Sequence, residues 1–127
     1  MKKKEYYLDL TQKLGITTLN LTNTIPINIK TKIILNQIIR SATSVGANYR
    51  AVCRSRSDAE FISKLGIVEE KADETLYWSE ILKNLDVIKD EHYKEIKSMA
   101  NHIVAFAIAS KKTIKKRLSK WNKHICY

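Results

Sequence analysis

The sequence predicts an all-α protein folded as a single four-helix bundle that spans residues 1–127. The chain of 127 residues contains three glycines and one proline, whereas turn-rich β architectures need many more such residues to reverse direction. Four segments carry apolar side chains at every third or fourth position, which is the period of a helix with one buried face. A chain of this length buries roughly two-thirds of its unfolded surface around one core, so one domain suffices.

The first predicted helix covers residues 3–24. Its apolar side chains near helical spacing are Tyr7, Leu10, Leu14 and Leu21. The stretch GITTLNLTNTI is rich in β-branched residues and asparagine, which are weak helix formers. We place the end of this helix before Pro26, because the residue before a proline avoids helical geometry.

The second predicted helix covers residues 27–54 and has two distinct faces. Its apolar face carries Ile34, Ile38, Ala42, Val45, Tyr49 and Val52. At 100° per residue, the opposite face carries Lys32, Arg40, Arg50 and Arg54. Gly46 costs about 1 kcal/mol relative to alanine in a helix interior, which indicates that another helix approaches closely there.

The third predicted helix covers residues 57–85 and begins with a capping box. Ser57 caps the helix, and Glu60 returns a hydrogen bond to the backbone of Ser57. One apolar stripe consists of Phe61, Leu65, Val68, Ala72, Leu76 and Ser79. A second stripe about 100° away consists of Ile67, Trp78 and Leu85. An apolar arc this wide contacts more than one neighbour, so the second stripe predicts an interface with another subunit.

The fourth predicted helix covers residues 90–122 and begins at Asp90. Its apolar side chains at helical spacing are Ile96, Ala100, Ile103, Ala107, Ile114 and Trp121. Its last turns carry Lys111, Lys112, Lys115, Lys116, Arg117 and Lys120. These cations suit the negative end of the helix dipole.

Charge alternates along the chain. The 23 basic and 13 acidic residues give a net charge of +10, an excess that attracts RNA, DNA or another polyanion. Residues 28–57 and 111–123 contain no acid, whereas residues 58–95 contain eleven acids. The pattern predicts either a basic binding face or an acidic segment that neutralises a basic one within the fold or between subunits.

Motifs for catalysis, metals and cofactors are missing from the sequence. It contains no glycine-rich phosphate loop, no cysteine pair at metal spacing and no Glu-x-x-His. His92, His102 and His124 share no ligand spacing and are interpreted as surface or partly buried side chains. We interpret Glu70 and Glu74 as part of a solvated or salt-bridged face, and Cys53 as a packed thiol. We therefore expect neither an enzyme nor a cofactor, a metal or a small-molecule substrate.

Two features bear on location. The cysteines lie far apart and the basic start MKKKEYYLDL has no apolar run long enough for a signal peptide, which predicts a reducing cytoplasm. No run of about 18 apolar residues occurs, which predicts no membrane span.

The arginines of the second helix have two predicted roles. Arg50, Arg54 and Arg56 lie at its end and in the connection that follows, where side chains are free to contact phosphates. Together with Lys111, Lys112, Lys115, Lys116 and Arg117 they form the predicted nucleic-acid contact set. Arg40 lies mid-helix and is predicted to form a structural ion pair with carboxylates of the third helix, in its own subunit or a neighbour. The aromatics Tyr49, Phe61 and Trp121 fall on core stripes and predict no base stacking.

The middle of the chain resembles a known family. The matching positions are Gln37-Ile-Ile-Arg40-Ser-Ala42, Ser44-Val45-Gly-Ala-Asn48, Arg54-x-Arg56-Ser57, Glu60-Phe61, Leu65, Glu70, Glu74-Thr75 and Tyr77-Trp78. They resemble the four helix bundle proteins, also called 23S rRNA intervening-sequence-encoded proteins. Many members have Ile-Ala-Glu after the asparagine, whereas this chain has Tyr49-Arg50-Ala51. The exchange makes this face more basic and puts the role of the missing acid in doubt.

The resemblance implies a small bacterial, cytoplasmic, up-and-down bundle without an assigned catalytic site. It further implies a ring-like homo-oligomer, with a homopentamer favoured. The family is similar to the accessory variability determinant of diversity-generating retroelements, a basic pentameric bundle that binds nucleic acid and a reverse transcriptase. The resemblance implies roles for individual residues only at the matched arginines Arg40, Arg54 and Arg56.

Two functions follow as predictions. The first is a non-catalytic, basic, oligomeric bundle that binds structured RNA or DNA through phosphate contacts. The alternative is a protein–protein adaptor whose basic and acidic faces drive self-assembly or partner docking without nucleic acid.

Overall fold

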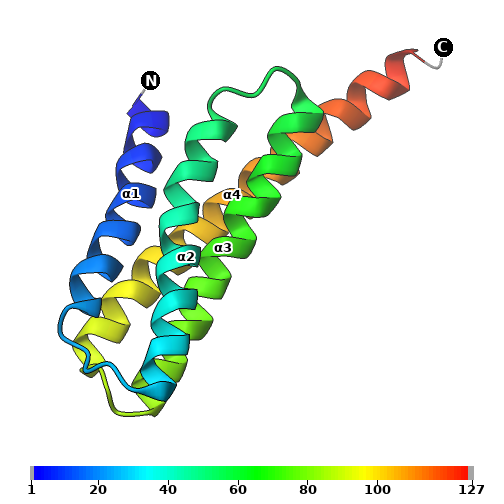
Figure 1. Ribbon diagram of the computed structural model, residues 1–127. Helices are drawn as coiled ribbons and strands as arrows, with labels where there is room; N and C mark the ends of the chain where they lie inside the picture. The colour runs from blue at the N-terminus through cyan, green and yellow to red at the C-terminus, as the bar shows by residue number, and fades with distance from the viewer. Residues whose placement is uncertain (1, 126–127) are drawn as a thin grey trace.

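Four helices form the computed structural model: α1 (Lys2–Thr22), α2 (Ile29–Val52), α3 (Asp58–Asn84) and α4 (Asp90–Ile125) (Figure 1). The structure describes the backbone of residues 2–125 and the side chains of residues 3–120. Within that part of the chain there is no strand, so the prediction of an all-α bundle is confirmed. The sequence interpretations of Trp121 and His124 concern side chains outside the described residues.

The helices pack in a closed cycle. α2 contacts α1 and α3, and α4 contacts α3 and α1. Successive helices run in opposite directions, so the bundle is of the up-and-down type (Figure 1). This order brings the start of α1, the end of α2 and the second half of α4 to the same end of the molecule.

α2 begins two residues later than the sequence pattern suggests, because Asn28 caps it. The Asn28 side-chain oxygen accepts hydrogen bonds from the backbone N–H groups of Lys30 and Thr31, both at 3.0 Å. The Thr31 hydroxyl oxygen accepts in return from the Asn28 N–H at 2.9 Å. This reciprocal box satisfies the first free amides of the helix and fixes its start.

One of the two hydrogen bonds of the predicted capping box is present at the start of α3. The Ser57 hydroxyl oxygen accepts from the Glu60 N–H at 3.1 Å. The predicted return bond to the Ser57 backbone is wrong, because a Glu60 carboxylate oxygen accepts from the Arg56 N–H at 3.5 Å instead. Lys64, one turn further along α3, holds the other carboxylate oxygen at 2.7 Å and draws Glu60 away from the cap.

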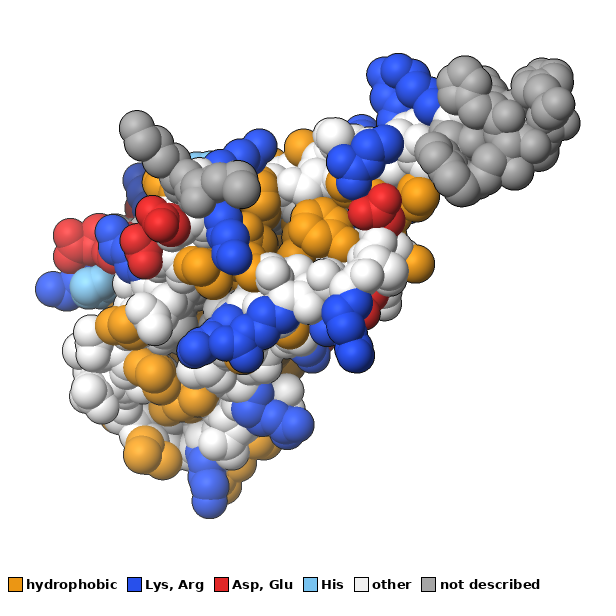
Figure 2. All heavy atoms as spheres, turned by 90° about the horizontal axis from the view of Figure 1, so that it is seen from above, with side chains coloured by type: hydrophobic (Ala, Val, Ile, Leu, Met, Phe, Trp, Pro, Cys, Tyr) orange, Lys and Arg blue, Asp and Glu red, His pale blue; other side chains and the backbone are white. Residues whose placement is uncertain are grey.

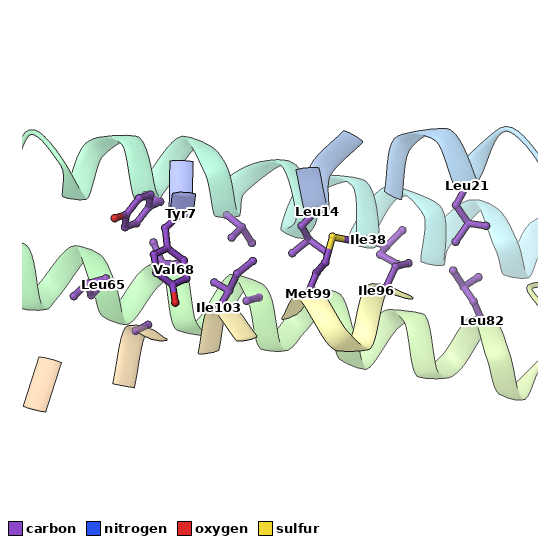
Figure 3. Packing of buried hydrophobic residues seen from close by; sticks show 14 of the residues in the cluster. Tyr7, Leu14, Leu21, Ile38, Leu65, Val68, Leu82, Ile96, Met99 and Ile103 are labelled. Carbon is purple, nitrogen blue, oxygen red and sulfur yellow. The ribbon is translucent and has the colours of Figure 1, made fainter. Parts of the chain in front are cut away.

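The core runs the length of the bundle (Figure 3). All six predicted apolar residues of α2 are buried, and they pack with Leu14, Leu65, Ile96 and Ile103. The weak helix formers of α1 enter the core with their polar groups satisfied. Thr11 and Thr18 are buried, and their hydroxyls donate to the carbonyls one turn earlier at 2.7 and 2.8 Å. Such back-bonding lets a hydroxyl enter an apolar interior without an unpaired group.

Glycines set the contact between α1 and α2. A Cβ atom on Gly46 would lie 3.3 Å from the Thr11 carbonyl oxygen and the Gln12 nitrogen, and one on Gly15 would lie 3.3 Å from the Ala42 carbonyl oxygen. The interpretation of Gly46 as a point of close helix approach is thus confirmed, and the partner is α1. The third glycine, Gly66 in α3, has no neighbour within 4 Å of such an atom.

α4 is the longest helix and leaves the bundle. Its 36 residues extend about 54 Å at 1.5 Å per residue. It crosses behind α2 and α3 and projects past the connection between them (Figure 1). Before it projects, α4 passes the first half of α3, where Lys111 contacts Glu69 and Arg117 contacts Asp58.

Candidate nucleic-acid interface

The two predicted basic segments meet at one end of the bundle. α2 ends at the connection to α3, and α4 passes the same connection. The Arg117 guanidinium lies 3.1 Å from the carboxylate of Asp58, the first residue of α3. The contact places the basic part of α4 beside the segment that carries Arg56.

Arg50, Arg54 and Arg56 are exposed and make no ion pair with a described carboxylate. The sequence gives the reason, since neither aspartate nor glutamate occurs between residues 10 and 57. Exposed guanidinium groups without a protein partner are available to phosphate oxygens.

The cations of α4 fall into two groups. Lys112, Lys115 and Lys116 are exposed and have no ion-pair partner among the described side chains. Lys111 instead lies 2.5 Å from a carboxylate oxygen of Glu69, and both side chains are mostly buried. The contact is an ion pair without hydrogen-bond alignment, since that oxygen has no hydrogen-bond partner. α3 therefore neutralises Lys111 and Arg117, but not the six remaining cations of the predicted set.

A groove of about 680 Å³ runs between α1 and α2. Its cationic side chains are Lys4, Arg50 and Arg54, and its apolar side chains include Leu8, Ile16 and Leu19. Figure 2 shows this end of the molecule, with Lys and Arg side chains spread over the surface and Asp and Glu gathered in two small groups. The groove adds Lys4 to the predicted basic surface.

Arg40 is exposed in the middle of α2 and makes no ion pair with the α3 carboxylates within the described residues. The predicted pair within one subunit is therefore absent. The physical reason is direction: the exposed face of α2 points away from α3, which packs on its buried side. The other predicted partner of Arg40, a carboxylate of α3 in a neighbouring subunit, stays a prediction.

The predicted oligomer stripe is only partly exposed. Ile67 and Leu85 are 38% and 41% exposed. Trp78 is half-buried and packs against the core of its own bundle. Tyr77, which the sequence analysis did not single out, is 53% exposed beside it. At 100° per residue Tyr77 lies about 80° from Ile67, on the face that carries Glu70, Asp73 and Glu80, so the apolar stripe does not include it.

A second exposed tyrosine, Tyr6, lies in the first turns of α1 and is 51% exposed. It lies outside the predicted core stripes and is not among the predicted site residues. Adjacent helical residues point about 100° apart, so only one ring of the pair Tyr6-Tyr7 fits into the core. That ring is Tyr7, which is buried.

Titratable side chains lie both in the core and on the surface of the described bundle. The described residues contain no group of three metal-ligating side chains. His92 is half-buried and His102 is exposed. Burial raises the pKa of Tyr49, and the neighbouring Cys53 raises this pKa further, so the phenol remains neutral. No helix within the described part combines the length and the apolar character that a membrane span requires.

Comparison with known proteins finds a matching family and similar solved structures. The model of a family described as 23S rRNA-intervening sequence protein matches residues 6–109. A crystal structure at 1.70 Å of a protein of unknown function from the S23 ribosomal protein family of Bacteroides thetaiotaomicron VPI-5482 is similar, with a TM-score of 0.77 and 32% identity. The match covers 87% of this chain and 98% of that one. No curated protein matches the chain. The α4 cations from Lys111 onward lie beyond the residues that match the family.

Proposed function

Because this chain belongs to the family of 23S rRNA-intervening sequence proteins, we propose that it is a non-catalytic bundle that binds structured RNA or DNA through phosphate contacts. The name of the family connects it with ribosomal RNA, and the basic end of the bundle supplies the chemistry. The resemblance and the sequence together favour a bacterial cytoplasmic protein that acts as a homo-oligomer.

One observation carries the proposal. Arg50, Arg54 and Arg56 are exposed cations without a described carboxylate partner, and the contact between Arg117 and Asp58 brings the basic segment of α4 to the same end of the molecule. An ordinary protein surface intersperses charges of both signs. A surface with an excess of cations attracts a phosphate backbone and releases its counterions, which gives affinity with little sequence preference.

The test is the salt dependence of binding to a fluorescent ribosomal RNA fragment. Replacement of Arg50, Arg54 and Arg56 by alanine should weaken binding and flatten the plot of log K against log [salt]. The expected change is about one unit of slope for each lost phosphate contact. The melting temperature should change little, because exposed side chains without partners contribute little to stability.

Lys30 and Lys32 provide the matched control. They are exposed cations in the first turn of α2, whereas Arg50 lies in its last turn and Arg54 and Arg56 follow its end. Their replacement by alanine should leave the slope almost unchanged. Equal effects of the two variants would show a diffuse charge effect, and unchanged binding of the arginine variant at every salt concentration would refute the proposed interface.

A second candidate function is self-assembly or partner docking through charge. Its supporting observation is the outer face of α3, where Glu70, Asp73 and Glu80 are exposed and make no ion pair with a described side chain. The same face carries exposed Ile67 and Tyr77. Acidic and apolar groups together fit the basic face of α2 on a second copy.

A further inference from the structure

Tyr6 belongs to an aromatic cluster that joins α1 to α4. Its ring meets the Tyr7 ring edge-on, with centroids 5.0 Å apart and planes at 89°. Tyr7 in turn stacks on Phe106 of α4 at 3.5 Å. The Tyr7 hydroxyl lies 3.0 Å from Nε2 of His102. These contacts fix the position of the Tyr6 ring although about half of its surface is exposed.

A second planar group stands beside this ring. The exposed imidazole of His102 lies 5.6 Å from the Tyr6 ring, with the planes tilted by 46°. Tyrosine and histidine are both side chains on which unpaired bases stack. Because a tyrosine has few rotatable bonds and this one is already packed on one edge, ordering it on binding costs little entropy.

Charged side chains of both signs lie near the cluster. The Lys3 ammonium lies 5.7 Å from the centroid of the Phe106 ring, and Lys4 joins Arg50 and Arg54 in the neighbouring groove. Lys4 and Asp9 both line that groove and therefore lie toward α2, whereas Tyr6 contacts His102 of α4. Glu5 is the other exposed carboxylate near the start of α1 and makes no ion pair with a described side chain.

We propose that Tyr6 is a stacking platform for an unpaired base, so that this end of the bundle prefers single-stranded or looped nucleic acid over a continuous duplex. The inference rests on the proposed function and names the class of nucleic acid. Bases inside a duplex stack on one another and present only their edges, whereas an unpaired base offers a free face to an aromatic ring. A phosphate next to that base then meets Lys3, and the strand continues toward the groove that Lys4, Arg50 and Arg54 line together with Asp9.

Tyr77 is a natural control within the same chain. It is 53% exposed, and its ring meets that of Trp78 edge-on at 5.0 Å, so its exposure and packing are those of Tyr6. Its surroundings are opposite in charge, because Asp73 and Glu80 precede and follow it by about one helical turn. Phosphates are repelled from that face, and a base is not expected to stack there.

The experiment measures the affinity of the full-length protein for two labelled probes of equal length, a single-stranded oligouridine and an RNA duplex. The variants are Tyr6→Leu, Tyr6→Ala, Tyr6→Phe and Tyr77→Leu. Leucine keeps an apolar side chain against Tyr7 but removes the aromatic face. We expect Tyr6→Leu and Tyr6→Ala to weaken binding of the single strand by about five- to a hundredfold. Tyr6→Phe should retain most of the affinity, and duplex binding should change less than about threefold in every variant.

The outcomes separate this inference from the proposed function. If Tyr6→Leu lowers the affinity for both probes equally, or for neither, Tyr6 is no platform, although salt-dependent binding by the parent protein would still support the proposed function. An equal loss in Tyr77→Leu would likewise overturn the inference. If the parent binds neither probe at low salt, the proposed function fails and this inference fails with it.

Discussion

Single atoms decide how closely the helices pack, and the three glycines illustrate the range. Gly15 and Gly46 let the backbones of α1 and α2 approach to distances at which a Cβ atom meets a carbonyl oxygen at 3.3 Å. Gly66 faces open space. The sequence indicated the role of Gly46 through its place in a helix interior, but it did not reveal which helix approaches.

These glycines predict substitutions of opposite sign. Gly46→Ala should lower the free energy of unfolding by about 1 kcal/mol, because the cost of overpacking against backbone atoms exceeds the gain in helix propensity. Gly66→Ala should raise it by about 0.5 to 1 kcal/mol, because the same gain meets no steric cost. Urea denaturation measures both. Stabilisation by both substitutions would show that α1 yields easily at this contact.

Other residues show where local sequence rules hold. Ser57 was predicted as a cap because serine followed by glutamate three residues later is a known signature. Asn28 was missed, because its partner at that position is a threonine, and the apolar pattern continues through Ile27. The hydrogen bond predicted from the Ser57 N–H to Glu60 is wrong. The Glu60 carboxylate accepts from the Arg56 N–H instead, because its other oxygen forms an ion pair with Lys64.

At the scale of elements, helical periodicity predicted four helices and the buried face of α2. It did not predict that α4 crosses the bundle and presents Lys111 and Arg117 to α3. Such a crossing depends on tertiary packing, and pairing of residues far apart in the chain leaves no periodic signal. The sequence consequently allowed the basic segment to be either a binding face or neutralised by the acidic helix. In the structure, α3 neutralises Lys111 and Arg117, whereas Lys112, Lys115 and Lys116 remain exposed.

The ion pair between Lys111 and Glu69 predicts a specific cost. Glu69→Gln leaves the mostly buried ammonium of Lys111 beside a neutral amide, and we expect the free energy of unfolding to fall by about 1 to 2 kcal/mol. Glu70→Gln changes the adjacent residue, which is exposed and has no described ion pair, and should cost less than about 0.5 kcal/mol. Equal effects in a denaturation experiment would mean that the pair does not anchor α4.

At the scale of the molecule, the bundle presents faces of opposite charge. The outer face of α2 carries Lys32 and Arg40 without a described acidic partner, and that of α3 carries Glu70, Asp73 and Glu80. Two different faces that complement each other form a head-to-tail contact, which closes into a ring or continues as a filament. The sequence predicted an oligomer from Ile67, Trp78 and Leu85. In the structure Trp78 packs against the core of its own bundle, whereas the neighbouring Tyr77 is exposed.

The last prediction concerns assembly. Light scattering at micromolar concentration should give a mass that is a multiple of 14.7 kDa. Ile67→Glu should shift the protein toward monomer with an unchanged helical spectrum, because it removes apolar area and adds a like charge to the acidic face. Ile108→Glu alters an isoleucine of α4 that is 37% exposed, about as exposed as Ile67 but outside the α2 and α3 faces of the predicted contact, and should leave the mass unchanged.

Charge exchange then tests which faces meet. Arg40→Glu should weaken assembly by placing an acid opposite the acids of α3, and combination with Glu70→Arg and Asp73→Arg should restore it, because the pairing is rebuilt with reversed signs. Restoration distinguishes a direct contact from a loss of stability, since exposed substitutions on two separate faces of one monomer do not compensate each other. A parent protein that is monomeric at all concentrations would refute the assembly. If the parent assembles and the Arg40→Glu variant assembles equally well, the interface lies on other faces.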